Sequence, residues 1–305
     1  MSMGLYDDKS SLVELELMKN GIMARCVSVT YYFDGKMQIK AQLRALGTGC
    51  ITATDAAKII SRVVAKRLDV SENNRIILNG NWNDYIFIET GRFEAVWGVA
   101  KKCYNDNSIS GDNYLVRKFP EGRAVFGIAD GMGCGTEANR DSMMALERLE
   151  SALIKGFSEQ NALESTNMIM AAGRKITAPV TVDLCVIDLF LGIAEFIKLG
   201  AVAAYLKRGN IIDVILSETL PIGVLEHVDF DSTKKKLYGG DYIILISDGV
   251  LEMMPELNKE KEFAKVLLKV NSLNPTAMAQ EIIDIVISDR VICDDLTVMV
   301  IGIYE

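Results

Sequence analysis

Residues 129–135 read Ala129-Asp130-Gly131-Met132-Gly133-Cys134-Gly135 and follow directly on the apolar run Ala124-Val125-Phe126-Gly127-Ile128. A short apolar run of this kind predicts a buried strand. Asp130 then stands at the end of that strand, where a rigid scaffold holds its carboxylate and the glycines leave space for a close neighbour. On its own, the same segment would also suit an aspartate that caps the following helix.

Two later segments repeat this arrangement of a carboxylate beside a strand. Ser247-Asp248-Gly249 follows the apolar run 242–246, and Asp294-Asp295-Leu296-Thr297 precedes the run 298–301. Three carboxylates brought together repel one another strongly unless a cation lies between them. Oxygen ligands of this kind favour Mg²⁺ or Mn²⁺ over zinc. The three segments together predict a carboxylate-held metal centre, binuclear and of the sort that activates water.

The composition excludes several classes of protein. Of the 305 residues, 50% are hydrophobic and 24% are charged, which is typical of a globular chain. The net charge of −8 argues against a nucleic-acid partner, because phosphate backbones attract basic surfaces. The sequence has no signal peptide and no apolar stretch of the ~18 residues that a membrane helix needs. We therefore expect a soluble, cytoplasmic protein.

Histidine and cysteine do not support other common chemistries. The only histidine, His227, falls in a polar turn, which excludes general catalysis by histidine. The cysteines form no Cys-x-x-Cys pair and no Cys-x₅-Arg phosphate loop, so we expect buried free thiols and no zinc site. The six cysteines are Cys26, Cys50, Cys103, Cys134, Cys185 and Cys293.

Residues 1–90 are predicted to form a small α+β unit without chemistry of its own. A short apolar helix ends at Asn20-Gly21, and Asp34-Gly35 is typical of a hairpin turn between two strands. A helix is expected to begin at Thr54-Asp55. The predicted strands are 26–32, 37–43, 74–79 and 84–89.

Residues 91–305 are predicted to form a second, larger domain. Asn274-Pro275 supplies a cap and a first-turn proline for a late helix, and Lys234-Lys235-Lys236 is expected in a solvated loop. Many antiparallel strands with separate helices predict an α+β fold, an antiparallel β-sandwich flanked by helices. The other predicted elements are helices at 136–155 and about 158–172, and strands at 93–100, 181–189, 193–199, 203–207 and 211–215.

The motifs of the second domain resemble those of the metal-dependent type 2C (PPM) protein phosphatases. As a set they are specific, whereas any single Ser-Asp-Gly would mean little. In chain order they are Ser110-Gly111-Asp112, the 129–135 segment, Leu220-Pro221-Ile222-Gly223, Gly240-Asp241, Ser247-Asp248-Gly249 and Asp294-Asp295-Leu296-Thr297.

Within that family the chain is similar to the SpoIIE (stage II sporulation) subgroup. The similarity runs from about residue 92 to the C-terminus and is weaker over 1–90. The chain departs from the subgroup at 175–179, which is shorter than usual, and at Val182, where leucine is usual. The subgroup motifs are the helix with Ala138, Asp141 and Ser142, then Val182-Asp183-Leu184, Lys198-Leu199-Gly200, Lys207-Arg208-Gly209 and Val298-Met299-Val300.

The resemblance implies a set of metal ligands. Asp130 would bridge two Mn²⁺ or Mg²⁺ ions, with the backbone carbonyl of Gly131 on one of them. Asp248 and Asp294 would complete the other ion's shell, and Asp112 would contribute from behind the ligands or through water. Asp295 adjoins Asp294, and the sequence leaves open which of the two faces the metal.

The resemblance also implies an activity and partners. The chain would hydrolyse phosphoserine or phosphothreonine on a protein, with an anti-sigma factor antagonist of sporulation as substrate. Residues 1–90 would regulate or position the phosphatase, with self-association as a homodimer as one means. The membrane helices of the subgroup are absent from this chain, which is either the soluble part of such a protein or a naturally short form.

Two other functions stay open on the sequence alone. The first is a catalytically silent, phosphatase-like module that binds a partner or dimerises, although the chain keeps Asp130, Asp248 and Asp294. The second is the same metal chemistry on a small phosphate ester, because specificity depends on the surrounding surface. No residue is assigned to hold the phosphate, and the nearby candidates are Lys101, Lys102 and Arg117.

Overall fold

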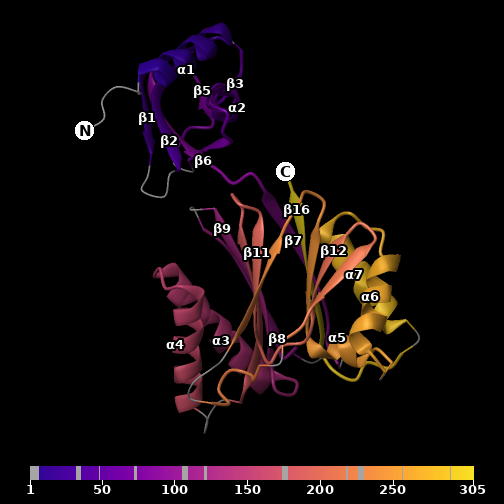
Figure 1. Cartoon of the computed structure of the whole chain (residues 1–305). Coiled ribbons are helices and arrows are strands. Elements are labelled where there is room, and N and C mark those ends of the chain that lie inside the picture. The colour runs from indigo at the N-terminus through magenta and orange to yellow at the C-terminus, as the bar shows by residue number, and fades with distance from the viewer. Residues whose placement is uncertain are drawn as a thin grey trace. The chain divides into compact units, whose positions relative to one another are not determined.

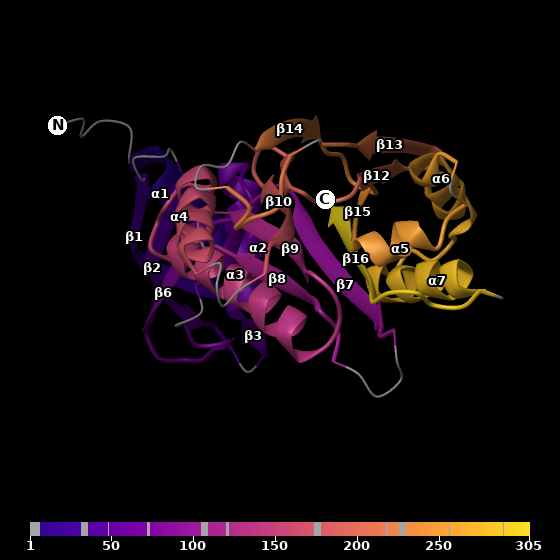
Figure 2. The same cartoon turned by 90° about the horizontal axis from the view of Figure 1, so that it is seen from below.

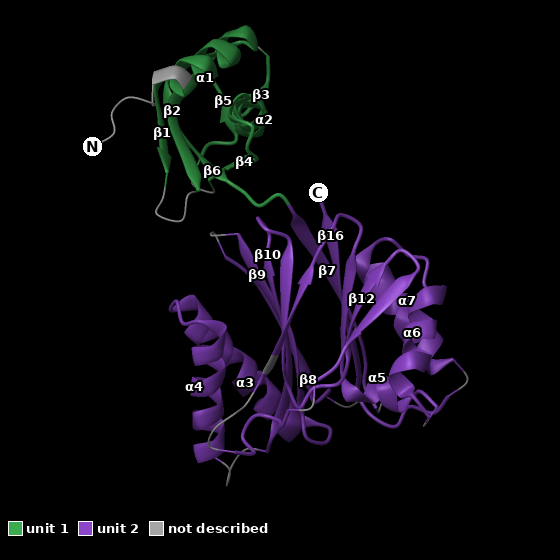
Figure 3. Ribbon diagram, in the orientation of Figure 1, with its two compact units in different colours: residues 1–92 green, residues 93–305 purple. Residues whose placement is uncertain are grey.

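A computed structural model describes residues 7–31, 36–47, 49–71, 74–104, 109–119, 122–173, 178–217, 219–225, 230–255, 257–288 and 290–305. The chain forms two compact units, Met1–Arg92 and Phe93–Glu305, which Figure 3 colours green and purple. The predicted Asp34-Gly35 turn, His227 and most of the shortened 175–179 segment lie outside the described residues.

The first unit is a twisted antiparallel sheet covered by two helices. Its strand order is β1-β2-β6-β4, and a separate two-stranded pair joins β3 to β5. Apolar side chains from both helices and the sheet form one core, including Leu17, Ile39, Ile60 and Phe87. The elements are α1 (Asp7–Lys19), β1 (Ile22–Tyr31), β2 (Met37–Ala45), β3 (Ile51–Thr52), α2 (Ala53–Val64), β4 (Leu68–Val70), β5 (Ile77–Leu78) and β6 (Asn83–Glu89).

The second unit contains two five-stranded antiparallel sheets. Their strand orders are β14-β11-β10-β9-β8 and β13-β12-β15-β16-β7. The strands are β7 (Glu94–Lys102), β8 (Asp112–Lys118), β9 (Arg123–Gly131), β10 (Val180–Asp188), β11 (Ile193–Leu199), β12 (Ala204–Arg208), β13 (Ile211–Ile215), β14 (Asp231–Lys236), β15 (Tyr242–Ile246) and β16 (Leu296–Tyr304).

Helices cover the outer faces of both sheets, so the second unit has four layers (Figures 1 and 2). Phe126, Phe196, Ile243 and Met299 belong to the core between the sheets. The arrangement confirms the predicted antiparallel sandwich with helices outside. One pair of helices, α3 (Thr136–Ile154) and α4 (Glu159–Ala172), packs on the β8–β11 side. Three others pack on the second sheet, α5 (Asp248–Glu252), α6 (Lys259–Lys269) and α7 (Pro275–Ile287).

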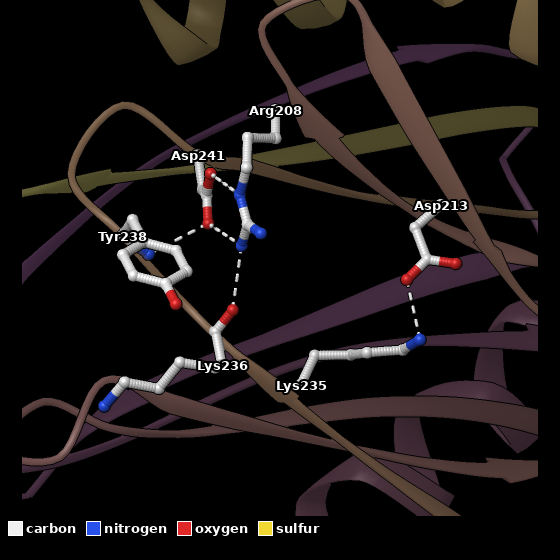
Figure 4. Close-up of polar contacts among 6 residues, drawn as sticks. All are labelled: Arg208, Asp213, Lys235, Lys236, Tyr238 and Asp241. Atoms are coloured by element: carbon white, nitrogen blue, oxygen red, sulfur yellow. Dashed lines mark hydrogen bonds and ion pairs between the residues drawn. The ribbon is translucent and has the colours of Figure 1, made fainter.

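The expected solvated loop at the three consecutive lysines is wrong, because these residues lie in the edge strand β14. Lys235 Nζ is 2.6 Å from Asp213 Oδ2, and Lys234 Nζ is 3.3 Å from Glu195 Oε2 (Lys235 and Asp213 are drawn in Figure 4). Lysines are common on edge strands, where charge discourages pairing with another chain. Strands β8 and β14 and helices α5 and α6 were likewise missing from the sequence prediction.

The expectation of buried cysteines holds only for Cys185. No two of the six described cysteines are joined, and four of them are exposed. In the described part of the chain, no helix is both long enough and apolar enough to cross a membrane.

A polar cluster lies at the turn between β14 and β15, just before the first residue of β15 (Figure 4). The guanidinium of Arg208 donates to both carboxylate oxygens of buried Asp241, over 2.8 and 2.7 Å, and stacks on the Tyr238 ring at 4.5 Å. Asp241 Oδ2 also accepts from the backbone N–H of Tyr238 at 2.9 Å. Two of the family motifs thus meet in one bidentate ion pair that fixes the turn between β14 and β15.

Candidate metal centre

Four of the predicted carboxylates lie where strands of both sheets end. Asp112 is the first residue of β8, Asp130 is the penultimate residue of β9, and Asp248 begins α5 directly after β15. Asp294 lies two residues before β16. Helices α3 and α5 begin at this end of the sandwich, the lower end in Figure 1. The structure therefore brings together side chains that are far apart in the sequence.

Asp130 is the most strongly perturbed member of this group. Burial raises the pKa of the Asp130 carboxyl well above its ordinary value, and the negative charges of Asp112 and then Asp248 raise it further. Without a cation, the site therefore holds a proton where several negative charges would otherwise meet.

Asp112 lies deepest in the group, with only 1% of its surface exposed. Burial raises its pKa, while the neighbouring hydroxyls of Thr297 and Ser247 partly offset the rise. By distance and angle, Asp112 Oδ2 still has no hydrogen-bond partner among the described residues. A buried carboxylate oxygen without a partner is costly, and a cation or its water would satisfy it.

The donor set fits a hard divalent cation. It consists of carboxylate oxygens and the backbone carbonyl of Gly131, which are the ligands that Mg²⁺ and Mn²⁺ prefer. In the part of the chain that the structure describes, no three such side chains already form a closed metal cage.

The structure distinguishes Asp294 from Asp295. Asp295 is 3% exposed, and its Oδ1 and Oδ2 accept from the backbone N–H groups of Tyr104 and Gly111 at 2.8 and 2.7 Å. Asp294 accepts one hydrogen bond, on Oδ1, from the Asp295 N–H at 2.7 Å. Burial raises the pKa of Asp294, and nearby Asp248 raises it further. Asp294 therefore faces the other carboxylates, whereas Asp295 ties the loop before β8 to the site.

The glycines of the two Asp-Gly pairs are needed for close packing. A Cβ at Gly131 would lie 2.2 Å from the carbonyl oxygen of Ala138 in α3. A Cβ at Gly249 would lie 2.2 Å from the carbonyl oxygen of Asp295. In both cases backbone atoms stand in the way, so a larger residue would move the aspartate that precedes it.

Helix α3 is bound to the Ser110-Gly111-Asp112 segment by side-chain hydrogen bonds. Ser142 Oγ donates to the Gly111 carbonyl at 2.5 Å, and Asn139 Nδ2 donates to the Ser110 carbonyl at 2.7 Å. On the same helix, Asp141 Oδ2 accepts from the Ala178 N–H at 2.8 Å. These contacts explain why the family motif on this helix contains polar residues on its buried face.

Two charged residues near the carboxylates received little or no weight in the sequence prediction. Glu252, one turn after Asp248 on α5, contributes to the raised pKa of Asp294. Its i, i+4 spacing from Asp248 is the signal that could have found it. Lys101 donates through Nζ to the Asp112 carbonyl at 2.6 Å. Arg117, by contrast, pairs with Glu150 of α3 at 3.4 Å.

A family model now places the chain. The model described as stage II sporulation protein E (SpoIIE) matches residues 120–304, which contain Asp130, Asp248 and Asp294. The chain belongs to the SpoIIE family. Its resemblance to type 2C phosphatases is thereby confirmed for the second unit.

Two SpoIIE proteins are similar along much of the chain. The Bacillus subtilis (strain 168) protein is 26% identical over 286 residues, which is 93% of this chain and 34% of that protein. The Priestia megaterium protein is 31% identical over 206 residues, or 67% of this chain and 35% of that protein. The chain thus spans about a third of the length of these curated relatives.

Solved structures show the same fold. The PP2C phosphatase domain of Bacillus subtilis SpoIIE, with a fragment of its regulatory domain, matches with a TM-score of 0.70 and 26% identity, covering 97% of this chain and 86% of that chain. RsbX in complex with magnesium is 16% identical and matches with a TM-score of 0.53, over 77% of this chain and 99% of that chain. The fold and family are those of PP2C-type serine phosphatases, which are metal-dependent enzymes.

Proposed function

We propose that this chain is a Mn²⁺- or Mg²⁺-dependent protein serine/threonine phosphatase. The observation that carries the proposal is the convergence of Asp112, Asp130, Asp248 and Asp294 at one end of the sandwich, where their charges perturb one another. Such a group is stable at neutral pH only with protons or cations between the carboxylates. The SpoIIE family match supports the cation reading.

The residues divide into ligands and supports. Two ions would be held by the carboxylates of Asp130, Asp248 and Asp294 and by the Gly131 carbonyl. Asp112 would act on the ions indirectly, through water or through the ligands. Asp295 would hold the loop before β8 in place through the Tyr104 and Gly111 N–H groups. When bound, the ions would lower the pKa of a water molecule and neutralise the oxygens of a phosphate monoester.

The substrate is proposed to be a phosphoprotein. The two curated relatives are sporulation proteins by name, and this supports a phosphorylated anti-sigma factor antagonist as the substrate. Residues 1–90 would regulate the phosphatase domain at 91–305, by self-association or by positioning it. Lys101, held beside Asp112, would attract the phosphate.

The test is hydrolysis by the purified chain of p-nitrophenyl phosphate and of a phosphoserine protein, with and without Mn²⁺. Metal-dependent turnover that Asp130→Asn abolishes is the expected result. A folded chain that binds Mn²⁺ but releases no phosphate from either substrate would instead favour the silent binding module.

A further inference from the structure

A buried ion pair joins two neighbouring strands of the β14-β11-β10-β9-β8 sheet in the second unit. Asp183 of β10 and Lys198 of β11 are direct cross-strand partners, and each is 1% exposed. Lys198 Nζ donates to Asp183 Oδ2. The proposed phosphatase chemistry assigns no role to either residue.

Stability alone does not account for this pair. Removing two charges from water is costly, and apolar residues of similar volume often replace a buried ion pair without loss of stability. On the same face of the sheet, two positions along each strand, Cys185 and Phe196 are buried in the core between the sheets. An apolar pair would therefore suit this position at least as well.

The pair adjoins the carboxylate group. Asp183 lies opposite Ile128 of β9, two residues before Asp130. Asp183, Asp130 and Asp248 line one cavity of about 10 Å³, together with Thr181 and Ser247. Asp183 Oδ1 has no hydrogen-bond partner among the described residues. The cavity thus has the size of about one water molecule, and several polar groups line it.

We infer that Asp183, held by Lys198, is a positioning residue for the metal centre. A water molecule in the cavity donates one hydrogen to Asp183 Oδ1 and the other to the carboxylate of Asp130 or Asp248. This link fixes the rotation of the ligand carboxylate before an ion arrives. Lys198 holds Asp183 in one orientation and balances its negative charge, so that a fifth carboxylate does not add to the repulsion. The inference rests on the metal centre of the proposed function.

The backbone that follows Lys198 is also held in place. Thr219 Oγ1 donates to the Lys198 carbonyl at 2.8 Å and accepts from the Gly200 N–H at 3.2 Å. Gly200 has a left-handed φ of +65°, and a Cβ there would lie 2.5 Å from Pro221. The backbone that carries Lys198 is therefore held at the end of β11, as a positioning role requires.

The experiment replaces the pair with apolar residues, Asp183→Leu with Lys198→Met. Mn²⁺ binding to the metal-stripped full chain is measured by titration calorimetry, and Tm is measured by circular dichroism. We expect the Tm to be retained and the Kd for Mn²⁺ to rise about 10- to 100-fold, as for other residues that orient metal ligands. An unchanged Kd in the folded double variant would overturn the inference.

The matched control is a second ion pair of this unit with a buried carboxylate, Arg208 and Asp241. Asp241 precedes β15 and Asp248 follows it, so this pair lies at the opposite end of that strand. Arg208→Met with Asp241→Leu should change the Tm and leave the Kd for Mn²⁺ unchanged. A parallel loss of Mn²⁺ affinity in this control would show a general effect of instability and overturn the inference.

Two further results are possible, an unfolded double variant and a wild-type chain that binds no Mn²⁺. If the double variant does not fold, Asp183→Asn keeps the shape of the side chain, and its Kd for Mn²⁺ decides the question. If the wild-type chain binds no Mn²⁺, the metal centre of the proposed function fails and the inference fails with it. If the wild-type chain binds Mn²⁺ and the variant binds it with the same Kd, the inference is wrong and the proposed metal centre stands.

Discussion

Asp112 and Asp130 lie directly opposite each other on the paired strands β8 and β9. Like charges at such positions destabilise a sheet. The pair is nevertheless central to the site, because Asp248, which begins α5 after strand β15 of the second sheet, also raises the pKa of Asp130. The second unit thus holds its carboxylates together against their repulsion, and a cation would relieve it.

Replacing Asp130 with Asn should therefore stabilise the metal-free protein while abolishing activity. The amide is neutral without a bound proton, so folding no longer has to protonate a buried carboxyl whose pKa is raised. We expect the Tm in EDTA to rise by about 2–4 °C, the shift for ~1 kcal/mol in a unit of this size. Phosphatase activity should fall by about 100-fold or more, because a ligand is lost. Thermal melts with EDTA and assays with Mn²⁺ check both expectations, and a lower Tm in EDTA would contradict the first.

The stability of the metal-free protein should fall as the pH rises. Burial and neighbouring charges raise the pKa of Asp130 and Asp112 above the ordinary 3.8. The folded state then binds more protons than the unfolded state, so the free energy of unfolding decreases as the pH rises above about 4 toward the folded pKa values. Urea unfolding in EDTA at pH 5 and pH 8 measures this slope, which should be smaller in Asp130→Asn. Equal slopes in the two proteins would refute the assignment.

Asp294 and Asp295 should respond differently to the same substitution. Asp294→Asn should weaken Mn²⁺ binding with little change in Tm, because this side chain faces the other carboxylates. Asp295→Asn should destabilise the fold by about 1–3 kcal/mol, because its amide group cannot accept from both the Tyr104 and Gly111 N–H groups. Calorimetric titration and urea unfolding of each variant separate the two roles. Loss of stability in Asp294→Asn and loss of Mn²⁺ binding in Asp295→Asn would show that the two roles are the other way round.

Gly249→Ala tests the close packing beneath Asp248. The new Cβ would meet the Asp295 carbonyl oxygen, so the backbone must shift, at about 1–3 kcal/mol, and Asp248 moves with it. Urea unfolding and Mn²⁺-dependent activity should both decline. Gly80→Ala is the control, because a Cβ there has no neighbour within 4 Å. A Gly249→Ala protein with normal activity would show that the packing is looser than described.

The sequence predicted the layers and most strands because their apolar patterns are local. Strand β14 was missed because its lysines are balanced by acidic residues of β11 and β13, Glu195 and Asp213, which only the fold brings near. The choice between Asp294 and Asp295 depends on backbone N–H groups of Tyr104 and Gly111, almost two hundred residues away. The cross-strand register that pairs Asp183 with Lys198 is likewise a property of the fold.

Lys101 and Lys102 test where the phosphate is held, because neighbours on one strand point to opposite faces. Lys101 Nζ lies 2.6 Å from the Asp112 carbonyl and 5.8 Å from the centre of the Tyr114 ring, so its charge is placed beside the carboxylate group. Lys101→Met should lower kcat/KM for a phosphoserine protein by about tenfold, the effect of losing one charge-assisted hydrogen bond. Lys102→Met should leave it unchanged. Steady-state kinetics with Mn²⁺ held constant measures both, and equal losses in the two variants would indicate general charge attraction rather than a phosphate contact at Lys101.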